Sequence, residues 1–215
     1  MDDGSESAPA NDKIVVINRY RQTNTDINRT EVIALAADSD PNVRCQAILA
    51  LGSRREVNQL GVIAERLLND PSPRVRGVSA VALGFIKTED SFTYLREALA
   101  DTSDFVVGNV LASFGMHRDK RAVPEVIPFL KDSSFNVRLA ACVLLIELGH
   151  VTVDVLDALD HMRHSAEGID QNRSLAEVEP IVEMHMAAAG SEMSMEGSVE
   201  TIDELYDRAY MLKYG

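Results

Sequence analysis

The sequence lacks tryptophan, and aromatic residues make up only 5% of its 215 positions. Its apolar residues are therefore mainly aliphatic, and the alanine and leucine among them favour helices. It also lacks any run of about 18 apolar residues, so it predicts no membrane-spanning helix. The first residues, MDDGSESAPAND, have neither the basic nor the apolar region of a signal peptide. These absences predict a cytoplasmic protein that contacts no membrane.

Cysteine is scarce: only Cys45 and Cys142 are present, and no C-x-x-C pair occurs. Both lie in apolar stretches, so we expect buried thiols in a reducing compartment rather than a disulfide. Basic residues are also in the minority, with 21 against 34 acidic residues and a net charge of −13. Most of the imbalance falls in residues 150–215, which carry 14 acidic and 4 basic residues. Such an acidic chain is a poor partner for duplex nucleic acid.

Motifs that carry chemistry are missing as well. We find no phosphate-binding or dinucleotide-binding glycine pattern, no H-E-x-x-H and no nucleophile elbow. The strongest candidate is DHMRH, because Asp157, His161 and His164 share one helix face and could hold a metal. The same residues fit a solvated face of a terminal helix, and no fourth ligand is evident beyond the remote His185. We therefore expect no catalytic residue, no metal site and no cofactor.

What the sequence does contain is a repeated phrase. When the copies are aligned on their valine, their first aspartates fall at steps of 32, 31 and 31 residues. An amphipathic run precedes each copy, so each unit predicts two helices joined by a tight turn. The copies are DSDPNVRCQAILALG (38–52), DPSPRVRGVSAVALG (70–84), the weaker DTSDFVVGNVLASFG (101–115) and DSSFNVRLAACVLLI (132–146).

The ends of the second helix in each unit are marked by residue type. Proline at the first helical position is favourable, since its missing N–H would have no partner there. We expect side-chain N-caps from Asp40, Ser72, Ser103 and Ser134. Glycine is the usual residue just beyond a helix, so we expect helices to stop at Gly52, Gly84, Gly115 and Gly149.

A period of about 31 residues with paired helices predicts an all-α solenoid, in which each unit buries its apolar face against its neighbours. We expect a polar N-terminus (1–11), a capping helix (12–28), repeats (29–165) and an acidic C-terminal helical cap (166–215). Within that cap, a capping box at Ser174 and Glu177 opens one helix. A linker at 191–198 then precedes a last amphipathic helix at 199–215.

The phrase D-x-[DS]-P-x-V-R, followed by an alanine-rich helix ending in Leu-Gly, resembles the HEAT repeats named after phycobilisome lyases. The resemblance covers about residues 29–165 and implies a right-handed α–α superhelix of about five units. It also implies that the turn aspartate and the helix arginine link adjacent units, here Asp38, Arg44, Asp70, Arg76, Asp132 and Arg138. The third copy has Asp101 but Val107, so we expect this ladder to be interrupted there. An iron enzyme of this architecture, deoxyhypusine hydroxylase, uses His-Glu pairs, and this sequence has none.

Basic residues follow successive second helices, and stacked units would bring them to one edge. That edge is a candidate for binding nucleic-acid phosphates, although the interleaved Glu56, Glu89 and Asp119 and the acidic balance argue against it. The residues are Arg54, Arg55, Lys87, Arg118, Lys120 and Arg121.

The second helices line the concave face in this family, and this chain places few charges there. With Val43 and Ala47 in the core, positions 42, 45, 49 and 53 of the first copy point outward. The matching outward positions of the four copies include Cys45, Gly77 and Gly108. The apolar residues at these positions that we expect to bind a partner are Leu49, Val81, Phe85, Phe105, Ala112, Met116, Leu139 and Val143. A register error of one position would instead make these residues ordinary core.

An exposed apolar strip predicts a groove for a helix or an extended segment. Its occupant would be another protein or the chain's own residues 199–214. We therefore expect a non-catalytic adaptor or scaffold that binds another protein. The alternatives are a phycobilin-lyase-like or enzyme-accessory protein, and a nucleic-acid binder.

Overall fold

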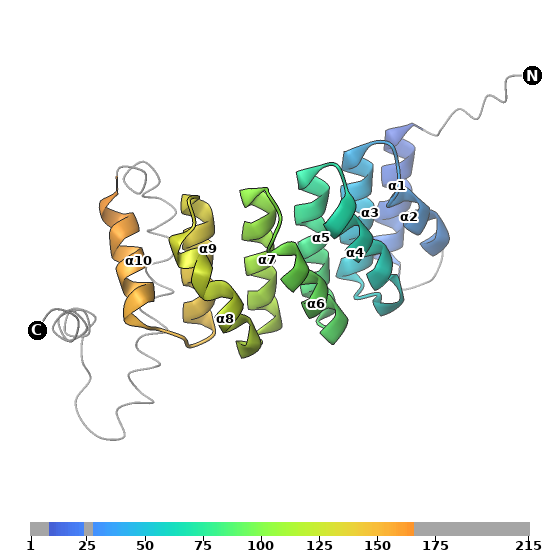
Figure 1. Ribbon diagram of the computed structural model, residues 1–215. Coiled ribbons are helices and arrows are strands. Elements are labelled where there is room, and N and C mark those ends of the chain that lie inside the picture. Colours follow the sequence, from blue (N-terminus) through green and yellow to red (C-terminus); the bar gives the residue numbers. More distant parts are fainter. Residues whose placement is uncertain (1–8, 24–27, 166–215) are drawn as a thin grey trace, which may run out of the picture. The chain divides into compact units, whose positions relative to one another are not determined.

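The computed structural model describes residues 9–23 and 28–165 (Figure 1). Every described element is a helix, which confirms the predicted all-α class. The predicted helices at 174–190 and 199–215 and the linker at 191–198 lie outside the described residues. The α-helices are α1 (Ala10–Gln22), α2 (Arg29–Leu35), α3 (Pro41–Ser53), α4 (Leu60–Asn69), α5 (Pro73–Ile86), α6 (Glu89–Ala98), α7 (Asp104–His117), α8 (Val123–Val126), α9 (Phe135–Glu147) and α10 (Val153–His164).

The chain divides into two compact units, Met1–His117 and Arg118–Gly215. In the first unit the predicted hairpins are present as α2–α3, α4–α5 and α6–α7, and they pack in two layers (Figure 1). The second helices form one layer, in which α3 contacts α5 and α5 contacts α7. In the other layer α4 contacts α6. The layer of second helices carries the candidate site.

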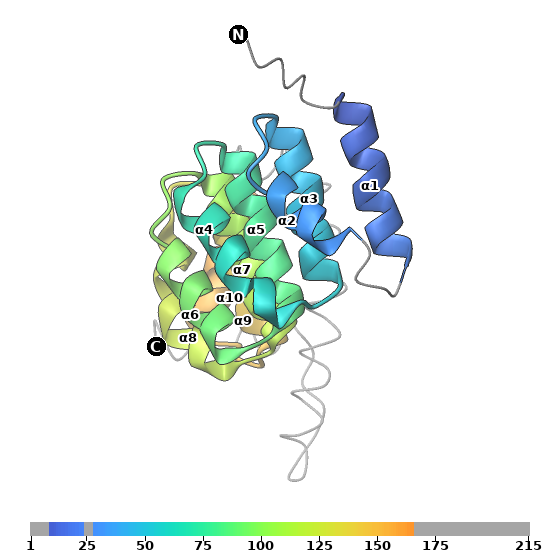
Figure 2. The ribbon, with the colours of Figure 1, turned by 90° about the vertical axis from the view of Figure 1, so that its right-hand side faces the viewer.

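Helix α1 covers one end of the first unit, beside α2 and α3 (Figure 2). Ile17 and Tyr20 are fully buried there. The Arg54 guanidinium lies 4.2 Å from the centre of the Tyr20 ring and donates to the Tyr20 carbonyl oxygen at 3.0 Å. The Tyr20 hydroxyl donates to Glu56 Oε1 at 3.1 Å, and burial together with Glu56 raises the pKa of this tyrosine. Helix α1 is therefore fixed by one buried aromatic group and its polar partners.

The second unit contains a broken first helix. Residues 123–131 form the short helix α8 and then the 3-10 helix η3 (Ile127–Lys131), because Pro128 has no N–H to continue an α-helix. Helix α9 contacts η3 and α10, with Phe135, Cys142 and Val155 buried among them. Helix α10 lies within the predicted repeat region, residues 29–165.

The second helices begin differently from the prediction. Asp40 caps α3 by accepting from the Asn42 N–H at 2.8 Å, but Ser72 and Ser134 make no side-chain cap bond. Instead, the aspartate two residues before each serine accepts a hydrogen bond from the serine N–H. Asp70 Oδ1 accepts from the Ser72 N–H at 3.0 Å, and Asp132 Oδ1 from the Ser134 N–H at 2.8 Å. The first aspartate of each phrase is thus a turn residue that orders the helix entry.

Gly52 and Gly84 do not end their helices, since α3 runs to Ser53 and α5 to Ile86. A Cβ atom on Gly52 would lie 2.5 Å from the Ala82 Cβ, and one on Gly84 would lie 2.8 Å from the Met116 sulfur. These glycines therefore let α3, α5 and α7 approach closely. Only Gly149, with φ of 73°, is a helix stop of the predicted kind.

Candidate functional site

The accessible side of the second helices in the first unit is a regular stripe. Exposed or half-buried residues recur there at steps of three and four, and the residues between them are mostly buried, as expected for one helix face. The accessible positions are 42, 46, 49 and 53 on α3, 74, 78, 81 and 85 on α5, and 105, 109, 112 and 116 on α7. We call these twelve positions the second-helix face.

The second-helix face carries a single charged residue, Arg74, whose guanidinium donates to Asn42 Oδ1 at 2.9 Å. Phe105 is 53% exposed, and its ring covers Gly77, where an added Cβ would lie 2.5 Å from the Phe105 Cε1. Seven neighbouring side chains make an apolar strip on this face: Leu49, Val78, Val81, Phe85, Phe105, Ala112 and Met116.

The predicted facing needs one correction, at the second position of α3, α5 and α9, whereas Gly108 at that position of α7 is half-buried. Cys45 is 3% exposed, Gly77 is buried and Leu139 is 9% exposed, so these residues lie with the core. The residue that follows each of them is the accessible one, and Val78 was missed for this reason. In the second unit, Val143 on α9 is half-buried. Whether any of these residues binds a partner stays a prediction.

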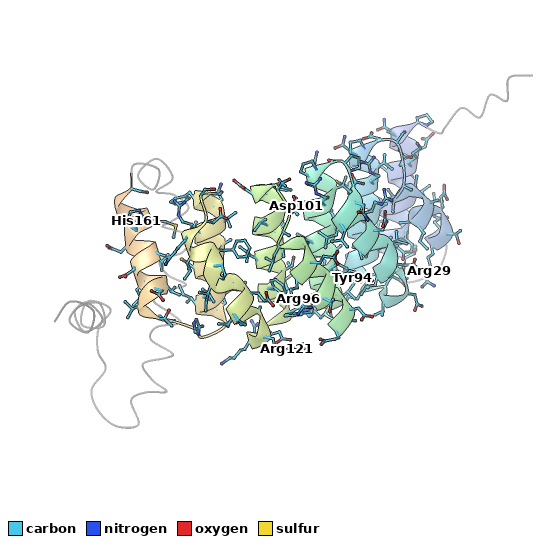
Figure 3. All side chains as sticks on the ribbon, in the orientation of Figure 1. Arg29, Tyr94, Arg96, Asp101, Arg121 and His161 are labelled. Atoms are coloured by element: carbon cyan, nitrogen blue, oxygen red, sulfur yellow. The ribbon has the colours of Figure 1, made fainter. Side chains whose placement is uncertain are left out.

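The opposite layer of the first unit has an ordinary charged surface. Exposed acidic residues lie on α2, α4 and α6, and Arg96 on α6 is exposed among them (Figure 3). Such side chains keep a helix face hydrated and weaken unspecific association. The apolar strip is therefore a property of the second-helix face and not of the surface in general. The acidic residues are Glu31, Glu65, Glu89, Asp90 and Glu97.

Two pairs of the predicted ladder of aspartates and arginines are present in the structure, since Asp70 and Asp101 each bind the arginine of the preceding copy. Arg44 binds Asp70 through Nε and Nη2, each at 2.8 Å, and its Nη1 donates to the Asp38 carbonyl oxygen at 2.9 Å. The pair is buried, with Asp70 only 2% exposed. Burial alone would raise the pKa of Asp70, but the Arg44 guanidinium and the Ser72 N–H together hold this pKa below its usual value.

The next pair joins Arg76 to Asp101, at 2.6 and 2.9 Å, so Asp101 takes part in the ladder. Burial favours the neutral form of Asp101, and Arg76 outweighs it and lowers the pKa. At the other end, Lys13 of α1 binds Asp38 at 2.7 Å and takes the place of an arginine. The ladder is interrupted at Val107, which stands where the other copies have arginine and has an alkyl side chain that donates no hydrogen bond.

The six basic residues of the predicted edge have different surroundings. Arg54 fixes α1, and Arg121 pairs with Asp119 at 2.6 Å. Three others, Arg55, Lys87 and Arg118, follow α3, α5 and α7, and each has a φ of 54°. This left-handed conformation costs a non-glycine residue about 1 to 2 kcal/mol. All three side chains are exposed and make no hydrogen bond or ion pair in the described part of the chain.

The remaining candidates can be placed briefly. Asp157 and His161 are exposed on α10, and the side chain of His164 lies outside the described residues. Among residues 9–23 and 28–165 there is no cluster of three metal-ligating side chains, and no helix there has the length and hydropathy to cross a membrane. Both thiols are buried and unpaired, and burial raises the pKa of Cys142 to about 12.

A comparison of the sequence with family models agrees with these helical hairpins. A family model of HEAT repeats matches residues 30–113. One solved structure, the complex of CpcE and CpcF of phycocyanin lyase from Nostoc sp. PCC7120, is similar with a TM-score of 0.43 and 16% identity. That match covers 83% of this chain and 93% of the other. No curated protein matches the sequence. The similarity to HEAT repeats thus covers the part of the first unit that runs from α2 into α7.

Proposed function

We propose that the protein is a non-catalytic scaffold that binds another protein through the second-helix face of its first unit. The observation that carries this proposal is the apolar strip on α3, α5 and α7. The second-helix face, to which the strip belongs, has one charged residue among its twelve accessible positions. Water contact at seven neighbouring apolar side chains is unfavourable, and a partner that covers them removes that cost.

The shape of the strip favours a helix or an extended segment as the ligand. Its side chains come from three parallel helices whose axes lie about 8 to 10 Å apart, as is general for packed helices. A partner helix crossing them would meet one apolar group about every two turns. Phe85, Phe105 and Met116 are the large members, and large side chains contribute most to such interfaces.

The proposal is tested by affinity purification from an extract of the native cells, with bound proteins identified by mass spectrometry. The wild type is compared with Ala112→Glu, which adds a charge at an exposed helical position and leaves the core intact. A second variant, Phe85→Asp with Met116→Asp, removes two large members of the strip. We expect a specific partner to be lost from both variants.

A matched control is Val57→Asp, because Val57 is 55% exposed in η1 (Val57–Gln59) and lies outside the strip. The control should retain the partner. A partner retained by all variants, each with a native far-UV spectrum, would move the binding site away from the second-helix face. No partner in any sample would refute the scaffold proposal.

A further inference from the structure

The second-helix face is graded, because its apolar residues gather toward the C-terminal ends of α3, α5 and α7. Positions 31 or 32 residues apart form rows across the three helices, and the bond of 2.9 Å from Arg74 to Asn42 lies within the first row. The two rows nearest the C-terminal ends hold most of the apolar strip. These two rows are Leu49, Val81 and Ala112, followed by Ser53, Phe85 and Met116.

Two cations continue this pattern of rows. Arg55 comes two residues after Ser53, and Lys87 comes two residues after Phe85. Two residues span at most about 7 Å, so both cations border the last apolar row. Their side chains are exposed and make no hydrogen bond or ion pair within the described residues. The adjacent Glu56 is already bound, since it accepts from the Tyr20 hydroxyl and from another arginine at 3.1 Å each.

The backbone at both cations adopts a conformation that glycine takes most easily. Arg55 and Lys87 each have a φ of 54°, in the left-handed region, and the residue after α9 in the second unit is Gly149 with φ of 73°. A cation gains from the carbonyl groups of a helix C-terminus, but that gain needs no left-handed residue. The first unit thus keeps two positive charges without a counter-charge beside its apolar rows.

The spacing of the rows matches an α-helix that runs along them. The axes of α3, α5 and α7 lie about 8 to 10 Å apart, and residues seven apart on an α-helix lie about 10.5 Å apart. Residues i, i+7 and i+14 of a partner helix would therefore meet the three helices in turn, and residues three or four further on would fill the second row. The flank of such a helix lies about 70 to 90° around its axis from the middle of its apolar side. One flank would then face Arg55 and Lys87 while the apolar side contacts the rows.

We propose that the partner presents an amphipathic α-helix with an apolar residue at every seventh position and an acidic flank, whose carboxylates bind Arg55 and Lys87. The inference rests on the proposed function and adds the chemistry of the partner segment. Exposed charges of both signs, Arg74 and Asp104, lie toward the N-terminal ends of the second helices, so only one flank of the partner needs to be acidic. Nucleic acid fits less well, because its phosphates would bind the cations and leave the apolar rows in water.

The probe is a displayed library of helical peptides about 18 residues long, which gives about 27 Å of helix. Leucine occupies the apolar positions, and each flank carries glutamate, glutamine or lysine. The purified full-length protein serves as bait, and the affinities of selected peptides are measured by fluorescence anisotropy. We expect peptides with glutamate along one flank to bind about threefold to thirtyfold more tightly than matched glutamine peptides, as two exposed charge pairs would provide.

Variants of the protein identify the surface that the peptides use. Arg55→Glu with Lys87→Glu should reverse the preference toward lysine peptides. Arg55→Gly with Lys87→Gly relieves the left-handed backbone, so it should fold normally and bind glutamate and glutamine peptides equally. Reversal of Arg19 and Arg96, which are exposed on α1 and α6, should leave the glutamate preference unchanged. Ala112→Glu, in the middle of the apolar rows, should bind none of the peptides.

The other outcomes separate this inference from the proposed function. Selected peptides without a charge preference would overturn the acidic flank and leave the strip as a helix-binding face. A glutamate preference that survives reversal of Arg55 and Lys87, or binding that survives Ala112→Glu, would overturn the proposed location. Failure to select any peptide would refute the helical ligand, while partner capture from cell extract would still decide the scaffold. Binding of a labelled DNA duplex that is lost on reversal of the two cations would assign them to nucleic acid, against the proposal.

Discussion

Replacing Arg44 by methionine should destabilise the first unit strongly. Methionine keeps much of the aliphatic length of arginine but leaves the carboxylate of Asp70, 2% exposed, without its two guanidinium bonds of 2.8 Å. Removing one partner of a buried ion pair costs about 3 to 5 kcal/mol. A control is Arg121→Met, because the pair of Arg121 with Asp119 is exposed, and such pairs contribute about 0 to 1 kcal/mol.

The free energy of unfolding is measured by urea titration followed by far-UV circular dichroism. The double variant Arg44→Met with Asp70→Asn removes both charges at once. It should be less destabilised than the sum of the two single variants, by roughly 1 to 3 kcal/mol. A loss in the double variant equal to the sum of the two single losses would show that the charge pair itself is not the source of the stability.

The dependence on pH provides a second check with a definite sign. In the wild type the folded-state pKa of Asp70 lies below its unfolded value. The contribution of the pair is therefore fully present above pH of about 4 and is lost as the pH falls through the folded pKa. In Arg44→Met the buried carboxyl has lost its main counter-charge, and burial raises its pKa. The difference between wild type and variant should thus shrink from pH 7 to about pH 4, and a constant difference would refute the reasoning.

Three further predictions concern backbone and thiols. Gly52→Ala should destabilise the protein by about 1 to 3 kcal/mol, because its Cβ would meet Ala82, whereas Gly61→Ala on α4 meets nothing and should stabilise it by about 0.5 to 1 kcal/mol, both by urea titration. Lys87→Gly should raise the free energy of unfolding by roughly 0.5 kcal/mol, because glycine removes the cost of the left-handed conformation but loses more backbone entropy on folding. A decrease of more than about 1 kcal/mol would contradict the backbone strain assigned to Lys87. Cys142, with its pKa raised to about 12, should react with iodoacetamide at pH 8 only when the second unit opens, and Cys45 only when the first does; mass spectrometry of labelled peptides would detect any faster reaction.

Local signals in the sequence were sufficient to predict the helical hairpins. Aspartate, proline and valine at fixed spacing mark the start of each second helix, and the 31-residue step predicts stacking. The partner of each arginine needed the structure, because Asp38 and Asp70 are both within reach of Arg44 in the sequence pattern. Arg44 uses the backbone of one and the carboxylate of the other.

Two predictions failed for a physical reason that residue identity does not reveal. A glycine near a helix end serves either as a stop or as a close contact, and Gly52 serves the second purpose. The stop falls three residues later on Arg55, whose residue type gave no such signal. The facing error at Cys45 arose because two buried residues, Val43 and Ala47, fix the phase of a helix only to within about one position.

The ladder also bears on how such a chain can lengthen. Arg44 and Arg76 each hold the carboxylate that lies 25 or 26 residues further on, together with carbonyl oxygens of their own turn. Duplicating one whole repeat would supply every new carboxylate with a guanidinium and every new guanidinium with a carboxylate. An insertion of a few residues inside a repeat would separate both partners and leave charges buried. Gene changes that copy entire repeats are therefore the ones this architecture tolerates, and Val107 marks a step where that constraint has been relaxed.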